Sequence, residues 1–374
     1  MKRVGILTFH TATNYGAVLQ TYALYKAIEG LGHQPVIVDR QATTIFRGEK
    51  KARLRYKILS LCPDFLLNMS PKLKHANVFH KFVKKYLPNK TDTYFNSKEL
   101  AEGHYKLDYL VVGSDQIWNY KLSEGQSAGM GLDMFGKFLP NETKRVSYAA
   151  SFGSDVWNEA PDITATIKDL VQKFSAVSVR EKSGEQICRD VFGVEAQTVL
   201  DPTLLAGGQF FLPMTEGIAH DDDYIFINKF KWEDEFTAAL NESLKVWKSK
   251  VVVNRARRAS DKYKMVSGLS VPEWLSMIRH AKIVITDSFH TLAFAILFNR
   301  PFIVVSREEE KRMGRLTNLI GMLGFDLSNR YMHYDRLPQI ESPEFLNIDY
   351  ANANQTLEVE RTKSLAFLRE ALEK

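Results

Sequence analysis

The chain has 374 residues, of which 45% are hydrophobic and 25% are charged, the composition of an ordinary globular protein. This length exceeds what one compact core usually holds, so we expect two domains. The two cysteines, Cys62 and Cys188, are far apart, which excludes a disulfide framework and a thiolate zinc site and fits a reducing cytoplasm. No run approaches 18 apolar residues and no targeting segment is recognisable, so we expect a cytoplasmic protein without a membrane span.

The net charge of +6 is concentrated in one segment. Residues 47–90 contain twelve Lys and Arg residues against Glu49 and Asp64, so this segment carries +10 and the rest of the chain −4. A local excess of this kind indicates a partner of the segment rather than of the whole surface. Peripheral contact with the anionic inner face of a membrane is one interpretation, and a solvated helical face over an ordinary core is the other. Nucleic acid is not expected as a partner, because no recognised binding motif accompanies the charge.

In chain order, the first half alternates strands and helices. A strand at 3–8, a helix at 17–31 and a strand at 35–38 make a βαβ unit, which predicts a parallel, right-handed crossover. Two basic helices follow, with breaks near Pro63 and Pro71. The further elements predicted for this half are helices at 51–67, 72–87, 161–174 and 182–192, and strands at 108–112, 145–150, 176–179 and 197–200.

The second half repeats the alternation. Its predicted strands are 224–228, 250–254, 282–286 and 301–305, and its predicted helices are 233–248, 271–280, 288–299, 308–323 and 355–373. Two successive alternations predict an α/β protein with two doubly wound, Rossmann-like domains that face a cleft. The expected limits are 1–205 and 206–350, and 351–374 supplies a last helix that packs back across the interface. Ligands in such folds lie beyond the carboxyl ends of the strands.

Polar residues follow two predicted strands of the first domain. Asn14, Tyr15 and Gly16 lead from the first strand to a helix N-terminus, where free N–H groups favour an anion. After strand 108–112 the chain reads GSDQIWN over 113–119. The polar residues Asp115, Gln116 and Asn119 could bind sugar hydroxyls while Trp118 offers an apolar face. For both segments the plain alternative is a turn without a ligand, with Trp118 in the core.

Two further strand ends carry groups suited to an anionic ligand. Arg180 opens a helix, where its fork could bind a carboxylate or phosphate, although an ion pair with Glu181 or Glu185 is an equal alternative. Ser288 could cap the helix after strand 282–286, and His290 would lie in its first turn; the alternative is a core histidine. We discount a hydrolase triad of Asp287, Ser288 and His290, because three residues within one turn rarely reach that geometry. No acidic cluster suggests a metal site.

These segments, in this order and spacing, resemble the polysaccharide pyruvyl transferases. The resemblance extends from Met1 to about Arg330. Its motifs are residues 10–20 (HTATNYGAVLQ), 108–119 (DYLVVGSDQIWN), 147–153 (SYAASFG), 179–181 (VRE), 201–202 (DP) and 286–290 (TDSFH). It implies a GT-B-like pair of domains, with the acceptor side in 1–205 and the donor side in 206–350. It also implies phosphoenolpyruvate as donor and a pyruvate ketal on a bacterial surface polysaccharide, or on its lipid-linked oligosaccharide precursor, as product.

The resemblance implies roles for individual residues. His290 would act as general acid toward phosphoenolpyruvate, and Asp115 would orient or deprotonate the acceptor hydroxyl. Many members have arginine where this chain has Ser288, so Arg312 or Arg315 of the next helix is expected to supply the charge. The expected donor contacts are Arg180, Ser288, Phe289 and Arg315. The expected acceptor contacts are Asn14, Tyr15, Gly16, Gln116, Trp118 and Asn119.

Neither a metal nor another cofactor is expected, because phosphoenolpyruvate is a co-substrate. Two other functional classes stay open from the sequence. One is a nucleotide-sugar glycosyltransferase of the same architecture. The other is a binding protein that keeps the fold without catalysis, which Ser288 in place of arginine would suit.

Overall fold

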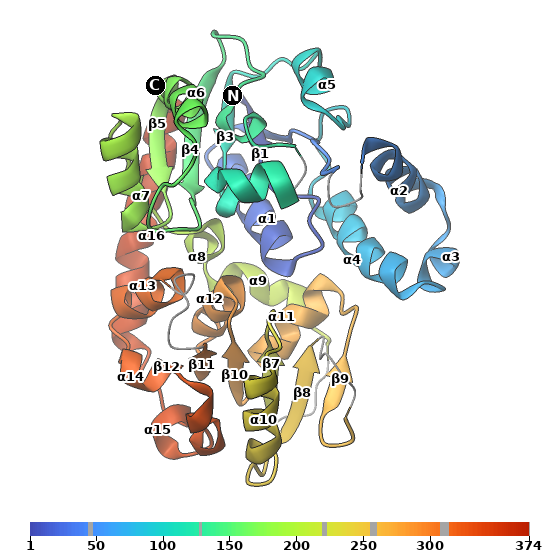
Figure 1. Cartoon of the computed structure of the whole chain (residues 1–374), viewed down its shortest axis with the longest axis vertical. Coiled ribbons are helices and arrows are strands. Elements are labelled where there is room, and N and C mark those ends of the chain that lie inside the picture. The colour runs from blue at the N-terminus through green and yellow to red at the C-terminus, as the bar shows by residue number, and fades with distance from the viewer. Residues whose placement is uncertain (44–47, 127–128, 219–222, 255–259, 307–313, 374) are drawn as a thin grey trace. The chain divides into compact units, whose positions relative to one another are not determined.

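The structure, a computed structural model, describes residues 1–43, 48–126, 129–218, 223–254, 260–306 and 314–373. These residues form two compact units, which we describe separately (Figure 1). Unit 1 consists of Met1–Leu205 together with Glu360–Lys374, and unit 2 consists of Ala206–Val359. Each unit contains a parallel six-stranded sheet and its own hydrophobic core, so the predicted class, two Rossmann-like α/β domains, is confirmed.

The sheet of unit 1 has the order β2-β1-β3-β4-β5-β6, with all neighbouring strands parallel. Its strands are β1 (Arg3–Leu7), β2 (Gln34–Ile37), β3 (Tyr109–Val112), β4 (Lys144–Ala150), β5 (Phe174–Val179) and β6 (Gln197–Thr198). Every residue of β3 is buried, as is usual for the centre of a parallel sheet. The winding of the sheet changes direction between β1 and β3, and ligands of such sheets bind at this switch point.

Helices flank this sheet and also form an insertion between β2 and β3. The insertion contains α2 (Glu49–Leu61), α3 (Asp64–Asn68), α4 (Pro71–Tyr86) and α5 (Ser97–Ala101). The remaining helices up to the boundary are α1 (Tyr15–Gly30), α6 (Pro161–Val171), α7 (Lys182–Ile187) and α8 (Pro202–Ala206), with short turns η2 (Gln116–Trp118), η3 (Leu122–Gln126), η4 (Asp133–Phe135) and η5 (Cys188–Phe192). The helix predicted over 51–67 is divided into α2 and α3 at Pro63, because proline cannot donate the backbone hydrogen bond that would continue it.

The sheet of unit 2 has the order β12-β11-β10-β7-β8-β9, the arrangement of a doubly wound dinucleotide-binding sheet. Its strands are β7 (Tyr224–Asn228), β8 (Lys250–Asn254), β9 (Lys264–Val266), β10 (Ile283–Thr286), β11 (Phe302–Val305) and β12 (Tyr331–Met332). The switch point lies between β7 and β10. The two edge strands, β9 and β12, were absent from the prediction because each has only two or three residues and no run of apolar residues.

The helices of unit 2 follow the predicted alternation. They are α9 (Gly208–Thr215), α10 (Asp234–Ser243), α11 (Val271–Arg279), α12 (Phe289–Leu297), α13 (Gly314–Met322), α14 (Leu327–Arg330), α15 (Pro343–Leu346) and the turn η6 (Tyr334–Gln339). The first part of the helix predicted over 308–323 lies outside the described residues. Helix α11 begins with a capping box, since Ser270 and Glu273 each bond to the other's backbone N–H.

The last helix, α16 (Ala351–Glu373), contributes to both units, because its residues from Glu360 onward belong to unit 1. In unit 1, Ser364 Oγ accepts a hydrogen bond from Leu200 N at 2.9 Å, and the Leu372 carbonyl accepts one from Lys2 Nζ at 2.6 Å. Leu368 and Leu372 are fully buried. The helix begins before residue 355, where the sequence predicted its start.

Candidate functional site

A pocket of about 190 Å³ lies at the switch point of unit 1, where β1 and β3 end. We name it the polar pocket after the side chains of Asn14, Asp115 and Gln116, which lie in its otherwise largely apolar lining. Asn14 follows β1 and caps α1, because its Oδ1 accepts a hydrogen bond from Ala17 N at 3.2 Å. Asp115 and Gln116 follow β3 and line the same pocket. The structure therefore brings together three residues that the sequence assigned to the acceptor and to its activation.

The backbone at Asp115 has an unusual conformation, with φ of 75° and ψ of −174°. This region is almost reserved for glycine and costs a side-chain-bearing residue about 1–3 kcal/mol. The surrounding structure fixes it, because the Asp115 carbonyl accepts hydrogen bonds from Ser151 N at 3.0 Å and Ile117 N at 2.7 Å. The preceding Gly113 has a φ of 135°, and a Cβ there would lie 2.0 Å from the Tyr148 carbonyl oxygen. The conformation directs the Asp115 side chain to the switch point.

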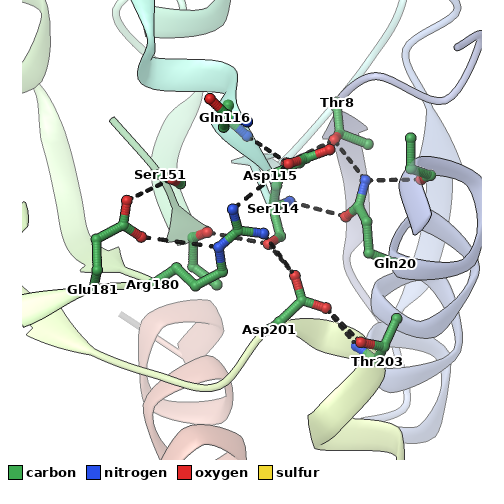
Figure 2. A network of polar contacts seen from close by, with 12 residues as sticks. Thr8, Gln20, Ser114, Asp115, Gln116, Ser151, Arg180, Glu181, Asp201 and Thr203 are labelled. Carbon is green, nitrogen blue, oxygen red and sulfur yellow. Dashed lines mark hydrogen bonds and ion pairs between the residues drawn. The ribbon is translucent and has the colours of Figure 1, made fainter. Parts of the chain in front are cut away.

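Arg180 lies behind Asp115, in the middle of three carboxylates (Figure 2). Its guanidinium is 3.2 Å from Asp201 Oδ2, 3.6 Å from Asp115 Oδ1 and 3.8 Å from Glu181 Oε2. Burial alone would lower the pKa of Arg180, but the three negative charges raise it, so the group stays charged. The ion pair with Glu181 is one of the readings that the sequence left open, and donor binding by Arg180 stays a prediction.

A second set of hydrogen bonds fixes the loop between β3 and Asp115 (Figure 2). Ser114 N donates to Gln20 Oε1 at 3.1 Å, Gln20 Nε2 donates to Thr8 Oγ1 at 2.9 Å, and Thr8 Oγ1 donates to the Ser114 carbonyl at 2.9 Å. Ser114 Oγ also donates to Asp201 Oδ2 at 3.0 Å, which joins this ring to the Arg180 cluster. The sequence did not assign a task to Thr8 or Gln20, although a buried glutamine on α1 is the kind of signal that indicates a polar network.

Trp118 does not offer a surface to a ligand, and the prediction that it contacts the acceptor is wrong. Its side chain is 0% exposed, its ring stacks on Phe135 with centroids 5.5 Å apart, and its Nε1 donates to the Met134 carbonyl at 3.2 Å. Turn η2 directs Trp118 into the core of unit 1 while Gln116, two residues earlier, lines the pocket. The sequence could not tell these directions apart, because they depend on that turn.

The remaining predicted acceptor residues lie around the pocket. Asn119 donates to Gln116 Oε1 at 3.3 Å, and its own Oδ1 accepts from Leu122 N at 3.1 Å. Tyr15 and Gly16 are buried in the first turn of α1, and the Tyr15 ring packs 5.0 Å from that of Phe79. Asn14 and Gln116 are thus the acceptor candidates that line the pocket itself.

At the switch point of unit 2, residues 287–290 follow β10 and begin α12. Ser288 is the N-cap, as predicted, with its Oγ accepting from Thr291 N at 3.5 Å. His290 lies in the first turn and is 7% exposed, with its ring edge-on to that of Phe289 at 5.3 Å. Arg315 is half-buried in the first turn of α13. The alternative Arg312 lies outside the described residues.

A buried lysine organises the loop after β7. Lys229 Nζ is 2.9 Å from Glu233 Oε2 and 3.1 Å from Asp287 Oδ2, and its side chain is 2% exposed. Burial would raise the pKa of Glu233, but the hydrogen bond from Lys229 lowers it. Asp287 Oδ1 also accepts from Phe230 N at 2.8 Å. Asp287 therefore joins the ends of β7 and β10, a task that the sequence did not reveal because Lys229 has no motif around it.

Asparagines at neighbouring strand ends complete the polar lining of this edge. Asn254 Nδ2 donates to Asn228 Oδ1 at 2.7 Å, and Asn228 Nδ2 donates to Thr291 Oγ1 at 2.6 Å. The chain of bonds links β8 and β7 to α12. Throughout the described part of the chain, no group of three His, Cys, Asp or Glu residues could hold a metal ion. The same residues include no helix that is long and apolar enough to cross a membrane.

Solved structures of similar fold cover nearly the whole chain. The UDP-GlcNAc 2-epimerase of Methanocaldococcus jannaschii, in complex with UDP-GlcNAc and UDP, has a TM-score of 0.53 and 11% identity, covering 96% of this chain and 99% of its own. MnaA of S. aureus with UDP gives 0.55 and 11%, covering 98% of both chains. Arabidopsis thaliana UGT89C1 with UDP-L-rhamnose gives 0.50 and 10%, again covering 98% of both. These identities show the fold alone, which is GT-B-like.

The sequence itself identifies the family more closely. No curated protein sequence matches the chain. The profile of the polysaccharide pyruvyl transferases, in contrast, matches residues 14–309, which is more than three quarters of the chain. The matched range begins at the Asn14 cap and includes Asp115, Arg180 and His290. The chain therefore belongs to the polysaccharide pyruvyl transferase family.

Proposed function

We propose that this protein transfers the pyruvyl group of phosphoenolpyruvate to a sugar of a bacterial surface polysaccharide, or of its lipid-linked precursor, and forms a pyruvate ketal. Family membership supports a transferase of polysaccharide biosynthesis. The observation that carries the proposal is the location of residues 286–290 (TDSFH) at the switch point of unit 2, where Ser288 caps α12 and His290 lies in its first turn.

In this proposal the donor binds to unit 2. Phosphoenolpyruvate carries a phosphate and a carboxylate, and the N-terminus of α12 has backbone N–H groups and a dipole that favour an anion. Ser288, Phe289 and Arg315 are the proposed contacts in this unit. Arg180 of unit 1 is a further predicted contact, although three carboxylates already surround its guanidinium.

The proposed reaction begins at the methylene carbon of the donor. Protonated His290 donates its proton to this carbon and leaves an oxocarbenium-like centre at C2. A sugar hydroxyl bonds to C2 and gives its proton to Asp115. The bond from C2 to the phosphate oxygen breaks, phosphate leaves with the electron pair, and a second hydroxyl closes the ketal and loses its proton to the phosphate. One donor and one diol thus give one ketal and one phosphate, without an oxidant or reductant.

The acceptor is assigned to the polar pocket of unit 1. Asn14 and Gln116 can exchange hydrogen bonds with sugar hydroxyls, and the Asp115 carboxylate can accept the proton of the attacking one. Asp115 is suited to this task because its backbone carbonyl accepts two hydrogen bonds and its Oδ1 accepts one from Gln116 N at 2.9 Å, so the carboxylate is already ordered before the sugar binds.

The test of this proposal is the His290→Ala variant, assayed for phosphate release from phosphoenolpyruvate in the presence of lipid-linked sugars. Loss of a general acid lowers kcat by about 10²–10⁴-fold. His280→Ala is the matched control, because His280 lies in the same unit at the other end of β10. Melting is measured for both variants to exclude unfolding. Equal turnover of the two variants would remove His290 from the mechanism.

A thermal-shift experiment separates the donor classes. Phosphoenolpyruvate should raise the melting temperature by mass action, whereas uridine diphosphate should not. Protection by uridine diphosphate alone would favour a nucleotide-sugar glycosyltransferase.

The helical insertion supports a further part of the proposal, peripheral contact with an anionic membrane where a lipid-linked acceptor would be presented. Its outward side carries large apolar side chains, with Leu61 79%, Phe65 68% and Met69 78% exposed. Exposed lysines lie on helices of the same insertion, among them Lys51 of α2 and Lys72 of α4. Apolar side chains among basic ones are the composition of surfaces that bind the interface of anionic bilayers.

A further inference from the structure

A second pocket of unit 1 lies between the helical insertion and the end of β1. It has a volume of about 60 Å³, and since one water needs about 10–15 Å³ by this measure, it has room for a group of several atoms. Apolar residues of α2 and α4 form its wall, including Ala52, Ala76 and Phe79, each less than 5% exposed. Charged groups on such a wall act through a lower effective dielectric than they would in water.

The ionisable groups that line this pocket are mostly basic. Arg55 comes from α2, His80 from α4 and Lys90 from the loop after α4. The acidic member is Asp39, and both of its oxygens are engaged: Oδ1 accepts from His10 at 2.9 Å and Gln41 at 2.5 Å, and Oδ2 accepts from Lys90 at 3.1 Å and Thr93 at 3.0 Å. Burial would raise the pKa of Asp39, but these partners hold it well below its usual range. Asp39 is therefore fully ionised.

The charge of the lining suits a dianion. With both histidines neutral, Arg55 and Lys90 outweigh Asp39 and leave one net positive charge. Protonation of His80 adds a second. A phosphate monoester carries about −1.5 to −2 at pH 7, whereas a sugar carboxylate carries only one charge. With His80 protonated, the net charge of the lining, two positive, thus balances the charge of a phosphoryl group.

The location of this pocket connects it to the acceptor. Thr11 and Ala42 line both this pocket and the polar pocket of Asn14, Asp115 and Gln116, so the two adjoin. We infer that the pocket of Arg55, His80 and Lys90 binds the phosphoryl group of a phosphorylated sugar acceptor, whose sugar ring lies in the adjoining pocket. The inference relies on the proposed function for the role of that sugar, and it adds a phosphate to the acceptor as a recognised group.

The binding of glucose 1-phosphate to the full chain, measured by calorimetry, tests this assignment. Removal of one charge-assisted partner weakens binding by about tenfold or more. We therefore expect that loss in Arg55→Gln and unchanged binding in Lys57→Gln, which removes the same charge from an exposed position of the same helix. Absent binding to the wild type, or equal weakening in the two variants, would overturn the inference.

Competing ligands identify the source of the phosphoryl group. Glucose 1-phosphate should bind more tightly than inorganic phosphate or glucose, because it occupies both pockets. If phosphoenolpyruvate displaced it with the same dependence on Arg55, the pocket would belong to the donor and the assignment to the acceptor would be wrong. If glucuronate bound as tightly as glucose 1-phosphate, the assignment to a phosphoryl group would be wrong.

The pH dependence of sulfate binding provides a second readout, in case Arg55→Gln does not fold. Burial and the charges of Lys90, Lys84 and Arg55 lower the pKa of His80, against the opposite effect of Asp39, so the neutral form is favoured without a bound anion. A bound anion raises that pKa, so binding takes up a proton, and the affinity for sulfate should fall as the pH rises from 5 toward 7. The other groups that face His80 are Asp39, His10 and Tyr56. His80→Gln should flatten this dependence, and an unchanged slope would exclude His80 from the site.

Failure of the phosphoryl-binding assignment can be distinguished from failure of the proposed pyruvyl transfer. Pyruvyl transfer to an acceptor without phosphate, with a KM that Arg55→Gln leaves unchanged, would overturn this inference alone. Arg55-dependent binding of glucose 1-phosphate by a protein that transfers no pyruvyl group would leave the pocket assigned and the proposed reaction wrong.

Discussion

Arg180 is one cation among three carboxylates, of which Asp201 and Glu181 are buried and Asp115 is partly exposed, and this arrangement decides which task suits it. The group of four carries a net charge of two negative, so a further anion at the guanidinium would meet repulsion from Asp115, Asp201 and Glu181. The arginine also supports the Asp115 side chain from behind, 3.6 Å away. These contacts favour a positioning task for Arg180 over direct binding of the donor.

Replacement of Arg180 distinguishes the two tasks. Removing one partner of a buried ion cluster usually costs about 3–5 kcal/mol, so we expect Arg180→Ala to lower the free energy of unfolding by about that amount. Arg189→Ala is the control, since Arg189 is exposed and belongs to the same unit. Denaturant unfolding measures both. Normal stability together with a raised KM for phosphoenolpyruvate alone would assign Arg180 to the donor instead.

The backbone conformation of Asp115 predicts that a glycine at this position makes the protein more stable than an asparagine does, while both substitutions abolish activity. Asp115→Asn keeps the positive φ and removes the charge, whereas Asp115→Gly also relieves the strain of about 1–3 kcal/mol. That relief exceeds the entropic cost of glycine, about 0.5–1 kcal/mol. We expect both variants to lose activity and the Gly variant to unfold at the higher denaturant concentration. An Asn variant as stable as the Gly variant would show that the backbone is not strained there.

For single residues, the sequence predicted the position in the sheet better than the direction in which the side chain points. Asp115, Gln116 and His290 lie at the strand ends where the sequence placed them, because polar residues after parallel strands meet at one edge of a sheet. Trp118 was assigned wrongly, because the turn that directs it into the core cannot be recognised from residue types. Lys229 was missed, because a buried lysine is recognisable only once its partners Glu233 and Asp287 are in place.

Among the elements, the buried parallel strands were predictable because burial on both faces requires continuous apolar runs, as in YLVV of β3 and FIVV of β11. Strand β9 (KMV) has no such run, since its residues are half-buried or exposed at the edge of the sheet. The helical insertion was predicted as two helices, but it contains three before α5. Pro63 and Pro71 each stand at the start of a helix, so the short helix α3 lies between them.

The composition of the insertion predicts that the protein binds to vesicles that contain anionic lipid. Full burial of an exposed Leu, Phe or Met contributes about 1.5–3 kcal/mol, so the variant Leu61→Ser, Phe65→Ser, Met69→Ser should lose most of its binding to vesicles with anionic lipid. A second variant, with Lys81, Lys84 and Lys85 changed to Gln, should weaken binding at low salt only. The Debye length falls from about 10 Å at 0.1 M to about 3 Å at 1 M, so salt removes the electrostatic part.

The control for vesicle sedimentation is a triple variant of other exposed apolar residues, Val156→Ser, Val246→Ser, Val359→Ser, which lie outside the insertion. Binding that persists in the Leu61, Phe65 and Met69 variant, or that ignores lipid charge and all three lysines, would rule out the membrane role. The insertion would then be an ordinary solvated surface.

For the whole molecule, each of the two units contains one parallel six-stranded sheet, and the strand orders of the two sheets differ. Both sheets are parallel, and in both the candidate residues stand at the switch point, β1 with β3 in unit 1 and β7 with β10 in unit 2. The alternation of strands and helices in the sequence was enough to predict this pair of sheets. The sequence did not predict which unit α16 packs on from Glu360 onward. Its amphipathic spacing shows that residues such as Leu368 and Leu372 are buried, but not against which core. That the two domains face a cleft stays a prediction.

The proposed activity is the transfer of a pyruvyl group from phosphoenolpyruvate. The most direct measurement is product analysis by mass spectrometry after incubation with phosphoenolpyruvate and lipid-linked sugars in deuterated water. The account predicts phosphate and pyruvylated sugar in equal amounts, with one deuterium in the new methyl group, because His290 delivers a solvent-exchanged proton to the methylene carbon. No pyruvylated product with any acceptor, or sugar transfer from a uridine diphosphate sugar in its place, would contradict the account.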